Sequence, residues 1–195
     1  MILLRHGQTL WNLHFGQTRI DPGLPDPGLT QEGRRQAAAA AEALACRGVK
    51  LLFASPYRRT LETAAVVAER LDVPVFIEPL LRERAGFSCD IGTRAGMLAE
   101  AWPALDFSAL DERWWCDLGE SDEEVLARAR AFRAAIAERP DRDSICAVTH
   151  WGVVRALTGE TVENGAIREH DPSGALPPVT PRVLDETLLQ EGSGQ

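Results

Sequence analysis

The chain has 195 residues, with 29 acidic and 21 basic side chains and a formal net charge of −8. This length is typical of one domain, so we expect a single domain over residues 1–195. The acidic balance disfavours nucleic acid and anionic membranes as partners, although a few arginines could still form a local anion site. No basic segment is followed by a long apolar run near the N-terminus, so we expect no signal peptide, no membrane span and a cytoplasmic location.

The four cysteines form no CxxC pair and have no histidine at ligand spacing. They are expected to be scattered reduced thiols. We therefore expect neither a bound metal nor another cofactor. The cysteines are Cys46, Cys89, Cys116 and Cys146.

The first half of the chain reads as strand, loop, helix and strand. The apolar residues 2–4 predict a buried strand that ends at Arg-His-Gly, and residues 8–28 predict a long loop rich in Gly, Pro and Asp. Thr30 is expected to cap an alanine-rich helix that runs to about residue 47. A second strand is expected at residues 51–54.

In the second half, Ser55-Pro56 predicts the start of a helix that runs to about residue 71, and residues 73–77 predict a third strand. The segment from 79 to about 119 is irregular, and its part from about 84 to 118 is a candidate lid. Ser121 and Glu124 form a capping-box pattern, which favours a helix.

A buried strand at residues 145–148 and a short helix at 153–157 follow, and the last twenty residues, 176–195, are expected to be loosely held. This alternation predicts an α/β fold, a three-layer sandwich with a mainly parallel central sheet flanked by helices.

Four residues follow the predicted strands and should meet at one edge of this sheet: Arg5, His6, Arg59 and His150. Helices that begin at that edge add their N–H groups and the positive ends of their dipoles. Arginine does not ligate cations and repels them, whereas its guanidinium group matches the oxygens of a phosphoryl group. The pattern therefore predicts a phosphoryl site. Helical periodicity alone does not choose between Arg58 and Arg59.

Five segments, in order, resemble the signature of the histidine phosphatase superfamily, the phosphoglycerate mutase-like enzymes. They are Arg-His-Gly-Gln-Thr-Leu-Trp-Asn at 5–12, Leu-Thr-Gln-Glu-Gly-Arg-Arg-Gln-Ala at 29–37, Ser-Pro-Tyr-Arg-Arg-Thr-Leu-Glu-Thr-Ala at 55–64, Leu-Arg-Glu at 81–83 and Val-Thr-His-Trp-Gly at 148–152. A lone Arg-His-Gly is a weak signal, but five ordered segments are a specific one. The alignment of the third segment selects Arg59.

The resemblance implies a role for each matching residue. His6 would be the nucleophile, and Glu83 would donate a proton to the leaving group. The other implied contacts are to the phosphoryl group. They come from Arg5, Arg59, His150 and Asn12, with Gly7 letting the backbone pass close by.

The chain also departs from the family pattern. The second acid of the Gly-x-x-Glu-Gly pattern is missing after Glu83, and Asp90 is a candidate to replace it. Trp102, Trp114 and Trp115 could roof the pocket or form a separate hydrophobic cluster. His14 is expected to be surface decoration, and His170 receives no role.

The resemblance favours a phosphatase that hydrolyses a small phosphorylated metabolite through a phosphohistidine. The long insertion that shields the phosphohistidine in cofactor-dependent mutases is absent, because only 67 positions separate Glu83 from His150. The alternatives are mutase-type phosphoryl transfer, a non-catalytic phosphate-binding or regulatory module, and a phosphatase of phosphoproteins. A homodimer is the default expectation for a soluble enzyme.

Overall fold

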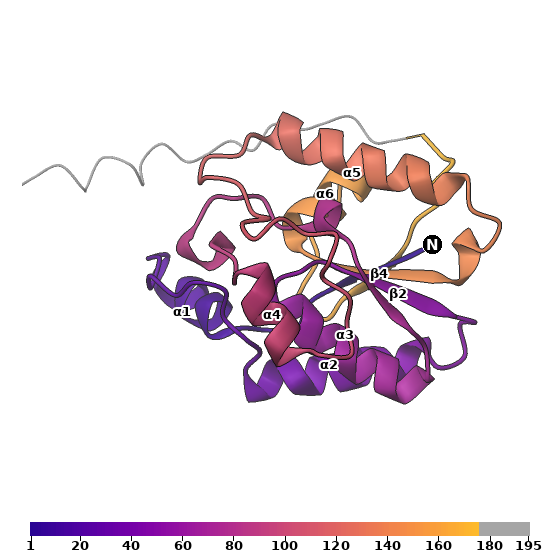
Figure 1. Ribbon diagram of the computed structural model, residues 1–195, viewed down its shortest axis with the longest axis horizontal. Coiled ribbons are helices and arrows are strands. Elements are labelled where there is room, and N and C mark those ends of the chain that lie inside the picture. Colours follow the sequence, from indigo (N-terminus) through magenta and orange to yellow (C-terminus); the bar gives the residue numbers. More distant parts are fainter. Residues whose placement is uncertain (176–195) are drawn as a thin grey trace, which may run out of the picture.

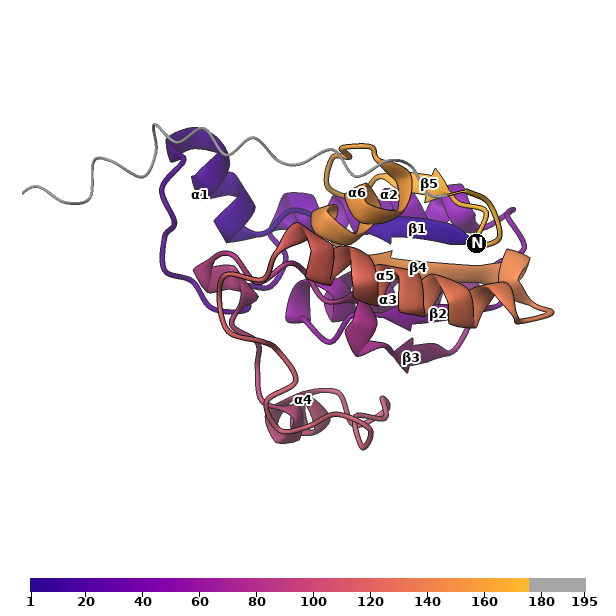
Figure 2. The same cartoon turned by 90° about the horizontal axis from the view of Figure 1, so that it is seen from above.

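The computed structural model describes residues 1–175 of the chain. Its centre is a five-stranded sheet (Figure 1), whose order β3-β2-β4-β1-β5 can be followed in Figure 2. The strands are β1 (Ile2–Arg5), β2 (Leu51–Ala54), β3 (Val75–Ile77), β4 (Ile145–Thr149) and β5 (Ile167–Glu169). Only β5, which pairs with β1, runs antiparallel to its neighbour. The predicted mainly parallel sheet is confirmed, and β5 is an addition that the sequence reading did not include.

Helices cover both faces of the sheet, as Figure 2 shows from above. On one face α2 (Gln31–Leu44) and α3 (Arg58–Leu71) pack on Leu4, Leu52 and Val148. On the other, α5 (Asp122–Ala137) and α6 (Trp151–Thr158) pack on Leu3 and Ala147. Successive strand residues thus enter opposite cores, as the alternation of side chains along a strand requires. The three-layer α/β prediction is confirmed.

The long loop predicted for residues 8–28 is wrong in its first half, which forms α1 (Leu10–Thr18). Thr9 caps this helix, and its hydroxyl accepts from the backbone N–H of Asn12 while the Asn12 side chain accepts from the Thr9 N–H. Trp11 is its only buried residue, so no apolar stripe of helical period marks the helix in the sequence.

Two predicted helix boundaries also differ. Helix α3 begins at Arg58 because the N–H of Ser55 still bonds to the Val148 carbonyl of the sheet. The first-turn N–H of Arg58 is then capped by the Asp26 carboxylate from the loop after α1. Helix α2 has the predicted Thr30 cap but ends at Leu44, three residues early. The predicted capping box of Ser121 and Glu124 at the start of α5 is confirmed.

The irregular segment after β3 contains the short 3-10 turns η1 (Pro79–Leu81) and η2 (Ser88–Asp90) and the helix α4 (Ala95–Ala101). Its tryptophans pack against the core beneath α3, where Trp114 meets Tyr57 edge-on with 4.7 Å between ring centroids. The hydrophobic-cluster interpretation of Trp102, Trp114 and Trp115 is therefore favoured over a roof on the pocket.

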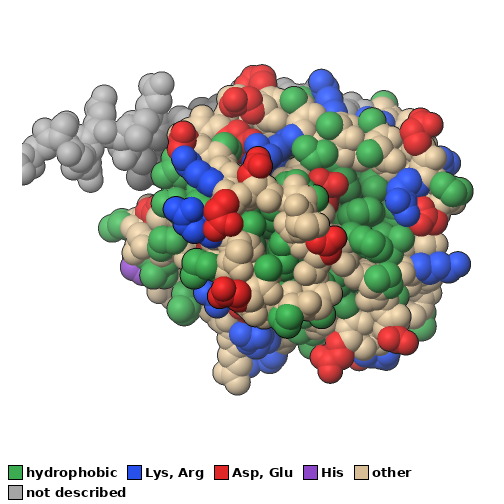
Figure 3. Space-filling view, in the orientation of Figure 1, with side chains coloured by type: hydrophobic (Ala, Val, Ile, Leu, Met, Phe, Trp, Pro, Cys, Tyr) green, Lys and Arg blue, Asp and Glu red, His purple; other side chains and the backbone are tan. Residues whose placement is uncertain are grey.

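Acidic and basic side chains are interspersed over the face in Figure 3, with apolar side chains between them. Among the described residues, no helix is both long and apolar enough to cross a membrane. The predicted loose tail at 176–195 lies outside the described residues.

Candidate active site

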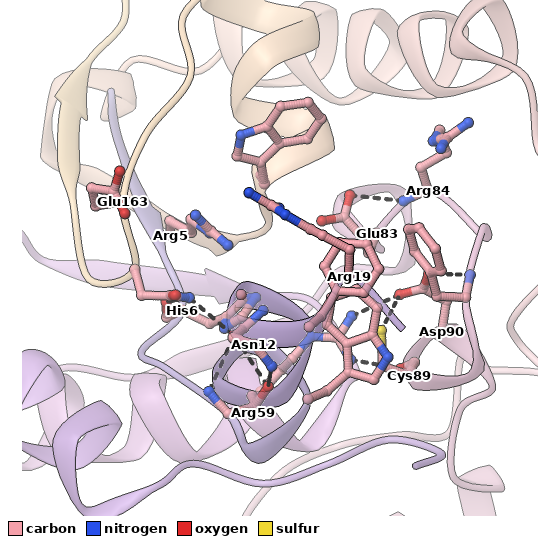
Figure 4. A pocket seen from close by; sticks show the side chains of 17 residues that line it. Arg5, His6, Asn12, Arg19, Arg59, Glu83, Arg84, Cys89, Asp90 and Glu163 are labelled. Atoms are coloured by element: carbon pink, nitrogen blue, oxygen red, sulfur yellow. Dashed lines mark hydrogen bonds and ion pairs between the residues drawn. The ribbon is translucent and has the colours of Figure 1, made fainter. Parts of the chain in front are cut away.

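A cavity of about 450 Å³ lies at the carboxyl edge of the sheet, where β1, β2 and β4 end (Figure 4). Five predicted residues line it: Arg5, His6, Asn12, Arg59 and Glu83. They come from the end of β1, from α1, from the start of α3 and from the segment between η1 and η2. Residues far apart in the chain thus meet here, at the ends of the strands they follow.

His6 is 3% exposed and has a defined tautomer. Its Nδ1 lies 2.7 Å from the Gly7 carbonyl oxygen. Because a carbonyl oxygen only accepts hydrogen bonds, Nδ1 carries the proton and Nε2 keeps its lone pair. Burial, followed by the charges of Arg59 and Arg5, lowers the pKa of His6 well below its usual value. The ring is therefore neutral at neutral pH, with a nucleophilic nitrogen available.

Arg59 lies beside His6 and is almost fully buried. Its guanidinium donates to the Cys89 carbonyl at 2.8 Å, to the Asp90 carboxylate at 3.1 Å and to His150 Nδ1 at 3.2 Å. Arg58, by contrast, is exposed and pairs with Glu62. The choice of Arg59 over Arg58 agrees with this geometry.

His150 is completely buried behind His6, with 5.1 Å between the two ring centroids. Its Nδ1 accepts from Arg59, so Nε2 carries the proton and donates to the Ser55 hydroxyl at 2.8 Å. It is not among the residues that line the cavity. Here His150 acts on Arg59 and Ser55, and its direct contact with a phosphoryl group stays a prediction.

Arg5 and Asn12 present donors to the cavity. Within residues 1–175, Arg5 donates from Nη1 to the Val162 carbonyl, and its guanidinium carries further hydrogens for a ligand. The Asn12 side-chain oxygen already accepts from Thr9 and from Asn164, so its NH₂ group is the part that can serve a ligand.

Among the described residues, three acids line the cavity: Glu83, Asp90 and Glu163 (Figure 4). Glu83 accepts from the backbone N–H groups of Arg84 at 2.8 Å and Gly152 at 3.0 Å. Burial, followed by the charge of Asp90, raises the pKa of Glu83. Asp90 is 1% exposed and accepts from Arg59. Asp90 also lines the cavity, and it stays the candidate to replace the missing second acid.

The structure gives a different reason for glycine at position 7. A Cβ there would lie 2.3 Å from the Gly33 carbonyl oxygen, so Gly7 permits the backbone after β1 to touch the start of α2. Gly7 does not line the cavity. The proximity of Gly7 to the phosphoryl group stays a prediction.

The aromatic part of the cavity was not predicted from the sequence. Trp11 and Phe15 stack with 4.5 Å between centroids, and Phe87 contacts both rings. Trp151 lines the cavity as well. Trp11 and Trp151 lie within two of the motif segments of the sequence, so these segments could have indicated aromatic residues at the cavity. Of the candidate lid 84–118, only residues between 84 and 90 reach the cavity.

The remaining histidines lie elsewhere: His14 is exposed on α1, and the backbone of His170 pairs with that of Met1. Within residues 1–175, no group of three or more His, Cys, Asp or Glu side chains is arranged to hold a metal ion.

Comparisons with known proteins place this site in a family. The family model described as the histidine phosphatase superfamily (branch 1) matches residues 1–170. Glucosyl-3-phosphoglycerate phosphatase of Mycobacterium tuberculosis is 34% identical over 167 residues, which span 81% of this chain and 73% of that protein. Phosphoserine phosphatase 1 of Hydrogenobacter thermophilus is 29% identical over 165 residues, 80% of this chain and 73% of that one.

Solved structures agree. A mycobacterial glucosyl-3-phosphoglycerate phosphatase in complex with VO3 superposes with a TM-score of 0.58 at 31% identity, over 80% of this chain and 77% of the other. A putative alpha-ribazole-5'-P phosphatase of Escherichia coli gives a TM-score of 0.59 at 26% identity, over 85% and 87%.

The fold and the site together define an α/β enzyme whose cavity is lined by His6 and by four arginines of the described residues: Arg5, Arg19, Arg59 and Arg84. The chain belongs to the histidine phosphatase superfamily, and we classify it with the phosphatases of that superfamily.

Proposed function

We propose that the chain hydrolyses phosphomonoesters of small molecules through a phosphohistidine at His6, without a metal ion. The observation that carries this proposal is the tautomer of His6. Its Nδ1–H is bound to the Gly7 carbonyl, so the Nε2 lone pair is the free nucleophile in a cavity that also presents Arg5 and Arg59.

In the first step Nε2 of His6 attacks phosphorus in line, the N–P bond forms and the P–O bond to the leaving alcohol breaks. The guanidinium groups of Arg5 and Arg59 stabilise the charge on the phosphoryl oxygens. The proton of Glu83 passes to the leaving oxygen. Burial supports this role because it raises the pKa of the Glu83 carboxyl and so favours the protonated form.

In the second step Glu83, now a carboxylate, takes a proton from water. The water oxygen attacks phosphorus, the N–P bond breaks and inorganic phosphate leaves. His6 returns to its neutral state with the lone pair on Nε2. Each group ends as it began, so the cycle needs no further reactant.

The size and lining of the cavity support a small substrate. A volume of about 450 Å³ falls within the range of ordinary small-molecule pockets. The rings of Trp11, Phe15 and Phe87 offer flat apolar surface to the leaving group. The two named relatives act on glucosyl-3-phosphoglycerate and phosphoserine, and we propose a phosphorylated metabolite of that size class.

The test is hydrolysis of p-nitrophenyl phosphate in the presence of EDTA, with wild type and His6→Ala compared. We expect activity that survives EDTA and falls by at least roughly 10³-fold in the variant, since loss of a covalent nucleophile removes the pathway itself. Equal rates in the two proteins would remove His6 from the mechanism. Phosphoryl transfer between phosphoglycerate isomers, without release of inorganic phosphate, would instead support the mutase alternative.

A further inference from the structure

Glu83 lies in a stretch of chain that no helix or strand contains. It sits between η1, which ends at Leu81, and η2, which begins at Ser88. A proton donor needs a well-defined position, because misplacement by about 1 Å can cost roughly 10²-fold in rate. The backbone on either side of Glu83 must therefore be held by other parts of the molecule.

Arg128, on α5, holds the segment before Glu83. Its Nη1 donates to the carbonyl oxygens of Leu80, at 2.9 Å, and Arg82, at 2.5 Å. The side chain is 6% exposed and lies far in sequence from both acceptors. One guanidinium nitrogen thus anchors the turn that leads into Glu83.

Glu120, just before α5, holds the segment after Glu83. Its Oε2 accepts from the backbone N–H of Ala85 at 3.1 Å, and the Ala85 carbonyl accepts from the N–H groups of Gly119 and Glu120. Glu120 is 6% exposed, so this too is a buried contact. The backbone is therefore bound on both sides of Glu83.

The two buried side chains also bind each other. Arg128 donates to both oxygens of Glu120, at 2.8 Å from Nε and 3.0 Å from Nη2, and Arg82 adds a third bond to Glu120 at 3.0 Å. Buried ion pairs pay a large desolvation penalty and are often no more stabilising than apolar residues of the same volume. Stability alone thus gives a weak reason for charges at this place, whereas fixing the geometry of the backbone gives a direct one.

We infer that Glu120 and Arg128 are positioning residues for catalysis, a buried clamp that sets where the Glu83 carboxyl meets the leaving oxygen. Neither residue lines the cavity, and both bind the backbone beside Glu83. The inference rests on the proposed role of Glu83 as proton donor. It adds to that role two residues that lie outside the Glu83 segment, one just before α5 and one on it.

Two substrates separate protonation of the leaving group from every other step. An alkyl phosphate such as 2-phenylethyl phosphate needs a proton on its leaving oxygen, whereas p-nitrophenolate leaves without one. Loss of the Glu83 proton, in Glu83→Gln, is expected to slow the alkyl ester by about 10²–10⁴-fold and the nitrophenyl ester far less.

The main variant is Arg128→Lys, which keeps the charge beside Glu120 but lacks the fork that also reaches the two carbonyl groups. We expect kcat/KM for the alkyl ester to fall by about 10²-fold, with the nitrophenyl ester changed less than about threefold. The double variant Glu120→Gln/Arg128→Met removes both buried charges together and should show the same selective loss. The matched control is Arg130→Lys, an exposed arginine on the same helix, for which neither rate should change.

The outcomes are distinguishable. A selective loss in Glu83→Gln but equal losses on both esters, or no losses, in the folded clamp variants would overturn the positioning role and leave the proposed function intact. Equal effects of Glu83→Gln on both esters would overturn the role of Glu83, and the inference with it. If Arg128→Lys fails to fold, the double variant decides by the same criterion.

Discussion

Glu83 and Asp90 both line the cavity, yet their surroundings differ. Asp90 binds the Arg59 guanidinium and two backbone N–H groups, whereas Glu83 accepts from two backbone N–H groups and lies near the negative charge of Asp90. Burial and the charge of Asp90 raise the pKa of Glu83, and this shift favours its protonated form. It supports Glu83, rather than Asp90, as the proton donor.

A pH dependence follows from the raised pKa of Glu83. The donor must be protonated, so kcat/KM for an alkyl phosphate should fall as pH rises through that pKa, which lies above the usual carboxyl value. Asp90→Asn removes the second cause of the shift and should move this fall to lower pH. The measurement is a pH–rate profile of both proteins, with p-nitrophenyl phosphate as the substrate that should lack this limb. A limb that stays in place in Asp90→Asn would contradict the assignment.

Site residues that follow a strand could be predicted from the sequence. His6 and Arg59 reach the cavity because strand ends and helix starts place them there, which is a property of the chain order. The hydrogen-bond partners of Arg59 and His150 were not predictable. The Ser55 hydroxyl beside His150 and the Cys89 carbonyl beside Arg59 depend on how irregular segments pack, which no local pattern specifies.

Among the elements, the contact between α6 and the Glu83 segment is unusually close. The N–H of Gly152, in the first turn of α6, donates to Glu83, and a Cβ at position 152 would lie 2.4 Å from the Glu83 Oε1 atom. A side chain there would push the carboxylate away from its donors. The lack of a side chain at position 152 therefore helps to set the position of the Glu83 carboxylate.

Gly152→Ala should therefore lower activity on an alkyl phosphate by about 10–10²-fold through displacement of Glu83, with a smaller effect on p-nitrophenyl phosphate. Gly96→Ala on α4 is the matched control, because its Cβ would make only ordinary contact with Glu112 at 3.5 Å. Steady-state kinetics on both esters provide the measurement. Wild-type rates in Gly152→Ala would show that the carboxylate tolerates the methyl group.

The elements also show why part of the fold escaped prediction. The helices α2 and α3 carry apolar stripes and were expected, but α1 has one buried residue and lies in a stretch rich in turn-forming residues. The strand β5 has three residues, none of them buried, and exists because β1 offers it an edge. Elements that depend on tertiary pairing rather than on their own pattern leave little trace in one sequence.

For the whole molecule, buried histidines link stability to pH. Burial is the leading cause that lowers the pKa of His6, His150 and His170, so the unfolded chain binds protons that the folded chain does not. Stability should therefore decline as pH falls below about 6.5, by at most roughly 1.4 kcal/mol per pH unit for each such histidine.

Urea denaturation at pH 7.0 and 5.5 tests this expectation through the free energy of unfolding. His150→Gln should reduce the loss of stability between the two pH values, because it removes one of the buried groups. His14→Gln, at the exposed histidine of α1, should leave that loss unchanged. The same pH dependence in wild type and His150→Gln would contradict the linkage.

The position of β1 in the sheet has a consequence for the newly made chain. Strand β1 is the first to be synthesised, yet both of its neighbours, β4 and β5, come from the other end of the described sequence. Until residues up to 149 have been synthesised, the apolar run 2–4 has no strand to pair with, and its second neighbour β5 follows only at residues 167–169. Asn164, which donates to the His6 carbonyl, is also made late. Pairing between strands so far apart in the sequence makes folding slow and leaves the apolar strand β1 unpaired in the meantime. The cavity is therefore completed late in synthesis, and activity indicates that β1 has paired with β4 and β5.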